Sequence, residues 1–303
     1  SYFRFMNRYT ARLGGLGAAM ITPFASDGAC DFAALGRMID YVIDGGIDYI
    51  VCLGTTAETP TLTEEERTEI LRFTRERIAG RVPLIVGAGG NSTAELIRHI
   101  GQMDLTGVDA LLSVTPYYNK PSQEGLYRHY RAVAEASPLP VILYNVPGRT
   151  GVNMTAETTC RLAADEPRII AVKEASGKID QIEQIIKNRP SGFIALSGDD
   201  SMAVDVMRKG GDGVISVAAN AFPSRFAHVI GLARQGLFDR AEEAYEPLRD
   251  AVCALFEQGN PTGVKAALAV MGRIENVLRL PLVPATDQLM KKLEKSIKEY
   301  DLR

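Results

Sequence analysis

The sequence predicts an α/β protein, a (β/α)₈ barrel followed by a helical C-terminal region. From Gly15 onward, short apolar runs alternate with longer segments of helical periodicity, which is typical of repeated βα units. There are eight such runs, whereas an open doubly wound sheet usually has about five to seven strands. After Val217 only helical patterns remain. These three observations favour a closed barrel with a C-terminal helical appendage.

The predicted strands share a short run of apolar, often β-branched residues, bounded by glycine, proline or polar residues. They are residues 17–21, 48–53, 83–87, 110–114, 141–144, 169–173, 193–196 and 213–217.

The predicted helices begin at recognisable capping residues. Thr63 is an N-cap candidate followed by three glutamates, and Ser92 with Glu95 has the spacing of a capping box. The C-terminal helical patterns cover residues 225–235, 238–256, 264–278 and 287–300.

Three regions follow from these patterns. We expect residues 1–14 to form an N-terminal extension, residues 15–223 the barrel and residues 224–303 the C-terminal helical region. No Gly/Ser-rich linker separates the last two regions.

The composition is that of a soluble globular protein that acts on a small molecule. The 303 residues are 46% hydrophobic and 23% charged, with a formal net charge of -3. Dispersed charges of both signs give no footprint for nucleic acid or an anionic membrane. No segment approaches the ~20 apolar residues that span a bilayer.

The cysteines and histidines predict neither disulfides nor a metal site. Cys30, Cys52, Cys160 and Cys253 lie far apart, without a C-x-x-C pair or a histidine at ligand spacing. Unpaired thiols fit a reducing cytoplasm, so we expect a cytoplasmic protein that uses no metal and no cofactor.

Polar residues cluster where the predicted strands end. In a (β/α)₈ barrel the active site lies at the carboxyl ends of the strands. The residues expected at this face are 54–58, 115–119, 144–149, 173–174, 197–200, 216 and 220.

Lys173 is the most informative of these residues, because it follows the apolar run 169–172 of a buried strand. A lysine that attacks a ketone must lose its proton, and lowering a lysine pKa from ~10.4 towards ~7 costs about 4 to 5 kcal/mol. Desolvation can supply this cost. The alternative is a structural lysine that pairs with Glu174 or extends its amine to the rim.

Three hydroxyl groups are candidates for proton transfer to and from that amine. Tyr144 lies one strand earlier, and Thr55 and Tyr118 follow other strands. The alternative for each tyrosine is core packing with a hydrogen-bonded hydroxyl group.

The remaining candidates would bind carboxylates. Arg149 follows a Pro-Gly turn, where a guanidinium can pair with a substrate carboxylate; the alternative is a surface arginine. Thr56, the amide of Gly198 and the backbone at Ile215 could hold a second small carboxylate.

At these positions the chain resembles the dihydrodipicolinate synthase and N-acetylneuraminate lyase family of pyruvate-dependent class I aldolases. The resemblance begins near Gly15 and covers nearly the whole chain. The matching runs are GTTAETPTL (54–62), TPYYNKPSQEGL (115–126), YNVPGRTG (144–151), KEASG (173–177), SGDD (197–200) and GGDGVISV (210–217).

The resemblance implies a role for each candidate. Lys173 would form an imine with pyruvate, and Tyr144 would transfer protons in a relay with Thr55 and Tyr118. Thr56 and the backbone at Ile215 would hold the pyruvate carboxylate, with Gly198 close by.

Arg149 points to the synthase branch of the family, where this arginine binds the carboxylate of aspartate semialdehyde. The expected reaction condenses pyruvate with L-aspartate 4-semialdehyde to 4-hydroxy-tetrahydrodipicolinate, on the route to diaminopimelate and lysine. The alternatives are an aldolase that cleaves a sialic acid or a 2-keto-3-deoxy sugar acid, and a silent member that only binds a keto acid.

The resemblance also implies an assembly. The tyrosine at position 117 would insert into the site of a neighbouring subunit across a tight dimer, and two such dimers would form a homotetramer. Asn91, Glu95 and Tyr117 match the family's lysine-binding cleft. Lysine-sensitive members often have histidines where this chain has Glu64 and Arg67, which puts feedback inhibition in doubt.

One residue departs from the family pattern inside a motif. Ala57 stands where glycine is usual, and its methyl group could alter the turn. Because both threonine hydroxyls remain, we expect activity to survive.

Overall fold

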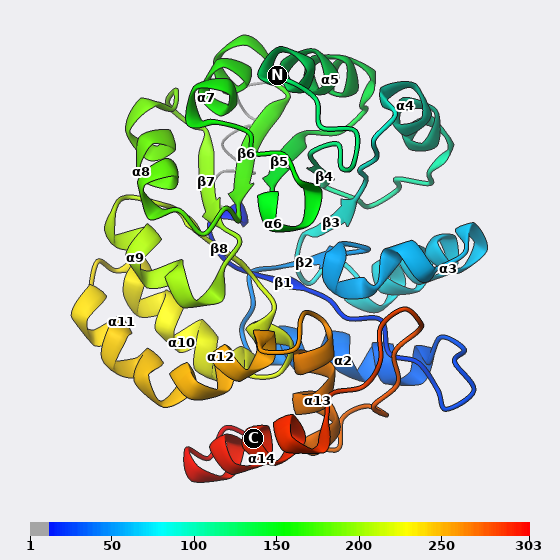
Figure 1. Cartoon of the computed structure of the whole chain (residues 1–303), viewed down its shortest axis with the longest axis vertical. Coiled ribbons are helices and arrows are strands. Elements are labelled where there is room, and N and C mark those ends of the chain that lie inside the picture. The colour runs from blue at the N-terminus through cyan, green and yellow to red at the C-terminus, as the bar shows by residue number, and fades with distance from the viewer. Residues whose placement is uncertain (1–11) are drawn as a thin grey trace. The chain divides into compact units, whose positions relative to one another are not determined.

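The computed structural model describes residues 12–303, and its eight strands close into a barrel in the order β1 to β8 (Figure 1). The pairs are parallel, for example β3 with β4 and β5 with β6. This confirms the predicted fold class. The strands are β1 (Gly15–Ala19), β2 (Tyr49–Cys52), β3 (Leu84–Gly87), β4 (Ala110–Val114), β5 (Val141–Asn145), β6 (Ile169–Glu174), β7 (Ile194–Ser197) and β8 (Gly213–Ser216).

The strand boundaries differ most from prediction at β1, which begins at Gly15 rather than at residue 17. The backbone N–H of Gly15 already donates to the carbonyl of Asp212 at 2.8 Å. Every residue from 15 to 22 is buried, so the apolar pattern continues past the end of the strand. Burial therefore located this strand but not its ends.

The described chain divides into two compact units. One contains residues 12–15 and 83–215, and the other contains residues 16–82 and 216–303. The predicted boundaries after residues 14 and 223 remain a prediction, and residues 1–11 of the predicted extension lie outside the described residues.

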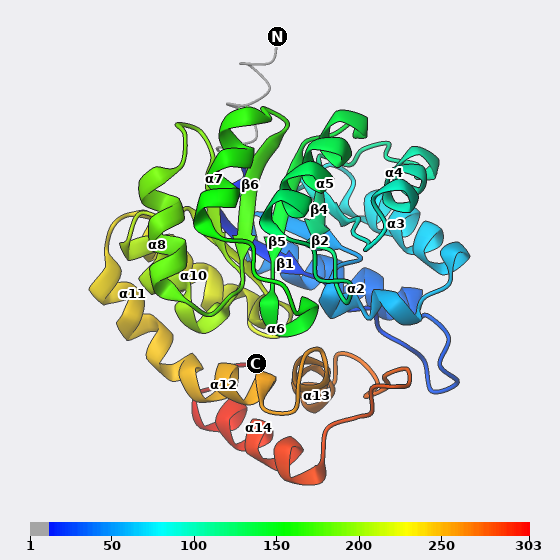
Figure 2. The ribbon, with the colours of Figure 1, turned by 45° about the horizontal axis from the view of Figure 1, so that its top comes forward.

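The first unit carries most of the barrel strands and a core beneath its helices. Helices α5, α7 and α8 lie side by side (Figures 1 and 2). The core cluster includes Tyr130 from α5 and Val172 from β6, both fully buried. The hydroxyl of Tyr130 donates to the carbonyl of Ser113 at 2.7 Å, which satisfies the polar end of this side chain. The helices are α4 (Thr93–Gln102), α5 (Gln123–Ala136), α6 (Pro147–Thr150), α7 (Ala156–Asp165), α8 (Ile179–Asn188) and α9 (Ala203–Arg208).

The second unit holds the first two barrel helices and all of the C-terminal helices. Helix α10 packs against α11, and α12, α13 and α14 contact one another (Figure 1). None of the helices described is long and apolar enough to cross a membrane. The helices are α2 (Phe32–Asp44), α3 (Glu64–Ile78), α10 (Pro223–Arg234), α11 (Phe238–Tyr245), α12 (Arg249–Phe256), α13 (Thr262–Val270) and α14 (Asp287–Glu299).

Two predicted C-terminal helices were too long. The pattern over 238–256 is interrupted by a 3₁₀ turn at Glu246–Leu248, because Pro247 has no N–H for a helical hydrogen bond. The pattern over 264–278 gives a helix only as far as Val270. Gly272 follows with a φ of 72°, a left-handed conformation that commonly ends a helix.

The capping box lies at a different helix from the one predicted. Thr63 accepts from the N–H of Glu66, and Glu66 accepts from the N–H of Thr63, which completes a box at the start of α3. Ser92 caps α4, but the Glu95 carboxylate pairs with Arg98 at 2.8 Å. The prediction that Ser92 is an N-cap is therefore confirmed, whereas the prediction that Ser92 and Glu95 form a capping box is wrong.

Candidate active site

Lys173 and Tyr144 lie next to each other at the ends of two paired strands. They are register partners on β6 and β5, and each is only 6% exposed. The amine Nζ lies 4.1 Å from the centroid of the tyrosine ring. Val172 packs in the core beneath the helices, so its neighbour Lys173 points to the opposite face of the strand, the barrel interior. The structure thus brings together the proposed nucleophile and proton-transfer residue.

The carboxylate beside this lysine has other partners. Glu174 Oε1 accepts hydrogen bonds from Asn145 Nδ2 at 2.9 Å, Gln181 Nε2 at 3.0 Å and the N–H of Ser176 at 3.2 Å. Burial raises the pKa of Glu174, and these hydrogen bonds partly oppose the rise. Within residues 12–303 no ion pair joins Glu174 to Lys173, so the predicted alternative of a paired structural lysine is not seen.

The end of β7 contributes a tightly packed glycine and an acid. The N–H of Gly198 donates to the Glu174 carbonyl at 2.8 Å, and a Cβ at this position would come within 2.5 Å of the Ala175 Cβ. Only glycine fits so close an approach. Burial raises the pKa of Asp199, and the positive charge of Lys173 partly lowers it. Ile215 lies on β8 and is 1% exposed.

Tyr118, in the loop after β4, and Arg149, on α6, are both exposed and lie on two segments that contact each other. The N–H of Tyr118 donates to the carbonyl of Thr150, which is the last residue of α6. The Tyr118 side chain is 88% exposed and its φ of 75° is left-handed, which is strained for a bulky residue. None of the residues 12–303 forms a hydrogen bond with the Tyr118 hydroxyl. Its role in the proton relay stays a prediction.

The residues expected in a lysine cleft are partly brought together. Asn91 Nδ2 donates to the Tyr117 carbonyl at 3.1 Å, and Asn119 Nδ2 donates to the Asn91 carbonyl at 2.8 Å. The Tyr117 side chain is 42% exposed. Glu95 is exposed and bound to Arg98. Tyr117 and Asn91 therefore share a surface, whereas a ligand for this cleft remains a prediction.

The two site threonines lie on a tight turn in the second unit. Thr55 and Thr56 begin a 3₁₀ turn, Thr55–Ala57, and Thr56 is 3% exposed. Ala57 is buried and has no positive φ, so its methyl group is compatible with the turn. The left-handed residue is Glu58, with a φ of 57°.

Sequence reasoning missed the residues that hold this turn. Asn260 Nδ2 donates to Thr56 Oγ1 at 2.9 Å. Lys265 pairs with Glu58 at 2.5 Å, with both side chains at most 1% exposed. Lys265 interrupts an apolar run of α13, as Lys173 interrupts that of β6, and this pattern could have identified it.

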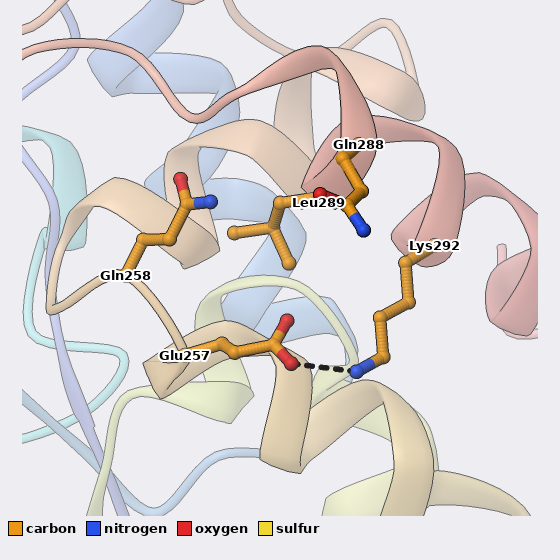
Figure 3. A pocket seen from close by; sticks show the side chains of 5 residues that line it. All are labelled: Glu257, Gln258, Gln288, Leu289 and Lys292. Carbon is orange, nitrogen blue, oxygen red and sulfur yellow. Dashed lines mark hydrogen bonds and ion pairs between the residues drawn. The ribbon is translucent and has the colours of Figure 1, made fainter.

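A cavity of about 170 Å³ lies where α12 and α14 approach each other, and none of the candidate site residues lines it. Glu257 pairs with Lys292 at 2.6 Å across it, and Gln258, Gln288 and Leu289 complete its lining (Figure 3). These charged groups neutralise each other on the surface. Within residues 12–303 no three His, Cys, Asp or Glu side chains are arranged to hold a metal.

The sequence model of the Dihydrodipicolinate synthetase family matches residues 12–300. The chain belongs to this family. It is 50% identical over 291 residues to the 4-hydroxy-tetrahydrodipicolinate synthase of Parabacteroides distasonis, covering 96% of this chain and 98% of that protein. It is 52% identical to the synthase of Phocaeicola vulgatus, with the same coverage of each chain.

Solved structures of the family have the same fold. The dihydrodipicolinate synthase from Thermotoga maritima superimposes with a TM-score of 0.93 at 42% identity, over 96% of this chain and 99% of that one. Family and fold together confirm the kind of enzyme expected from the sequence, a lyase of lysine biosynthesis.

Proposed function

We propose that this chain is a 4-hydroxy-tetrahydrodipicolinate synthase that joins pyruvate to L-aspartate 4-semialdehyde through an imine on Lys173. The observation that carries the proposal is the buried Lys173 amine, 4.1 Å from the ring of Tyr144 on the neighbouring barrel strand. Membership of the family and the names of its relatives support the choice of substrates.

The chemistry begins with the amine of Lys173. Its neutral form attacks the ketone carbon of pyruvate, and loss of water gives the imine. Removal of a methyl proton then gives an enamine, whose carbon attacks the aldehyde of the second substrate. The amino group of that substrate finally displaces the lysine and closes the ring.

Each of these steps moves a proton, and we assign this transfer to Tyr144. Its ring lies against the amine, and its phenol can both donate and accept. We assign Thr55 and Tyr118 to the same relay, as in the family. Because Tyr118 is 88% exposed in the single chain, its part in the relay requires a partner surface.

The Tyr144→Phe variant should slow imine formation about 100-fold, because proton transfer by a positioned group typically contributes 10²–10⁴-fold. The measurement is the rate at which borohydride-trapped pyruvate adduct appears after rapid mixing. Tyr127→Phe removes a surface hydroxyl bound to Asp165 and serves as the control. Wild-type trapping rates in Tyr144→Phe would reject its role.

We assign the substrate carboxylates to separate groups. Thr56, the backbone at Ile215 and the Gly198 region would hold pyruvate, and Arg149 on α6 would hold the semialdehyde. A guanidinium pairs with a carboxylate through two parallel hydrogen bonds, which suits an exposed position over an entering substrate.

Arg149→Ala should raise the KM for the semialdehyde about 10- to 100-fold, the usual cost of a lost hydrogen bond to a charged group. The pyruvate concentration that half-saturates borohydride trapping should not change. Arg128→Ala, which removes an exposed arginine on α5, is the matched control. An unchanged semialdehyde KM would contradict the assignment.

Turnover assays test the overall proposal against its rivals. The purified protein should consume pyruvate and aspartate semialdehyde together and should not cleave sialic acid or 2-keto-3-deoxy sugar acids. No turnover of the semialdehyde, or faster cleavage of a sugar acid, would reject the substrate assignment. No turnover of any of them would favour a silent binding protein.

We further propose a cytoplasmic homotetramer in which Tyr117 contacts a second subunit. The exposed fractions of Tyr117 and Tyr118, 42% and 88%, support the subunit contact. The unpaired state of all four cysteines supports the cytoplasmic location.

Lysine binding near Asn91, Glu95 and Tyr117 is proposed for the same surface. Sedimentation and kinetics with and without lysine test these two points.

A further inference from the structure

The turn that carries Thr55 and Thr56 is contacted by residues of the C-terminal helical region, which belongs to the same unit. Asn260, just before α13, donates from Nδ2 to Thr56 Oγ1 at 2.9 Å. The Thr56 side chain is 3% exposed, so water does not replace this contact. The amide thus fixes one side of a buried hydroxyl.

The same turn ends in a strained residue with a buried charge. Glu58 has a left-handed φ of 57°, which costs about 1–3 kcal/mol for a residue other than glycine. Its carboxylate lies 2.5 Å from Lys265 Nζ and also accepts from the N–H of Arg279 at 3.1 Å. These contacts hold Glu58 in place, and with it the direction of the turn.

Helix α13 supplies the Lys265 contact, and the segment just before it supplies the Asn260 contact. Lys265 donates to the Val277 carbonyl at 2.9 Å and lies 4.2 Å from the Phe24 ring centroid. A Cβ on Gly263 would come within 1.9 Å of the Leu255 carbonyl oxygen, so the start of α13 packs directly on α12. Asn260 and Lys265 therefore contact the turn from a part of the chain that packs closely against α12.

The hydrogen bond from Asn260 leaves the proton of the Thr56 hydroxyl available for donation. A hydroxyl has one proton to donate, and when its oxygen accepts from the amide the proton must go elsewhere. Within residues 12–303 no acceptor takes it. A buried donor without an acceptor is costly, which suits a position that a ligand completes.

We propose that Asn260 is a positioning residue for substrate: its amide orients the Thr56 hydroxyl as a donor to the carboxylate of the keto acid. The inference rests on the proposed binding of pyruvate by Thr56. Asn260 itself need not touch the substrate, because it acts through the hydroxyl.

The test measures the pyruvate concentration that half-saturates borohydride trapping of the adduct, a readout that does not need the second substrate. Asn260→Ala should raise this concentration about 5- to 10-fold, the effect of one lost neutral hydrogen bond. Asn260→Asp should raise this concentration further. A carboxylate only accepts hydrogen bonds, so the Thr56 hydroxyl would donate to Asp at position 260 and not to the substrate. The KM for the semialdehyde should stay within about twofold in both.

A double-mutant cycle separates orientation from general damage. Thr56→Val alone should raise the half-saturating concentration, and Asn260→Ala should add nothing in the Thr56→Val background. Gln258→Glu places a charge two residues from Asn260 and should leave the concentration unchanged. Melting temperatures of all variants check that the fold is kept.

The inference would be overturned if Asn260→Ala raised the half-saturating pyruvate concentration equally in the wild-type and Thr56→Val backgrounds. It would also be overturned if Asn260→Asp had the wild-type half-saturating concentration. If Thr56→Val itself trapped pyruvate like the wild type, the proposed function of Thr56 would fail instead.

Discussion

Replacing Lys173 by arginine is expected to lower kcat/KM at least about 10³-fold, because the variant keeps the positive charge and loses the amine that we propose forms the imine. Arginine stays protonated in proteins and cannot act as an amine nucleophile. Steady-state assays with pyruvate and the semialdehyde give the measurement. The folded state should survive, since a cation remains in the same place.

The neighbouring lysine provides the control for this result. Lys178 is exposed and lies five residues further on, before α8. Lys178→Arg should retain wild-type turnover. If Lys173→Arg retained more than about one tenth of the wild-type kcat/KM, covalent catalysis by Lys173 would be excluded.

The largest loss of stability is expected from Lys265→Met. Removing one member of a buried ion pair strands the other charge, which typically costs 3–5 kcal/mol. Here the group left unpaired would be the Glu58 carboxylate. The side chains of Glu58 and Lys265 are each at most 1% exposed. Burial already lowers the pKa of Lys265, and the Glu58 charge partly restores it. We expect the melting temperature to fall by about 5 to 15 °C.

Two further variants show whether burial is the cause. Lys292→Met breaks the exposed pair with Glu257 and should cost less than about 1 kcal/mol. Glu58→Gln combined with Lys265→Met removes the stranded charge and should recover much of the loss. Similar melting temperatures for Lys265→Met and Lys292→Met would contradict this account of the pair.

The barrel could be predicted from the sequence because its signal is local and repeated. Each buried strand is a short apolar run, and β4 (Ala110–Val114) occurs where the run predicts it. Boundaries depend on single hydrogen bonds and turns. Pro247 therefore divided a predicted helix, and the continuous burial around β1 concealed its ends.

The candidate site could be predicted where a residue differs in polarity from its neighbours in the sequence. Lys173 is conspicuous because a charge ends an apolar strand, and Tyr144 follows from its place one strand earlier. Asn260 gives no such signal, since its partner Thr56 is 204 residues away in the chain. Contacts of that range are set by the packing of α13, which periodicity cannot reveal.

The most direct test of the central claim is the mass of the protein after borohydride reduction in the presence of pyruvate. The proposed imine predicts a gain equal to pyruvic acid less one oxygen atom, confined to the peptide that contains Lys173. The gain should be absent from Lys173→Arg. An unchanged mass, or an adduct on another lysine while Lys173 stays unmodified, would contradict the proposal.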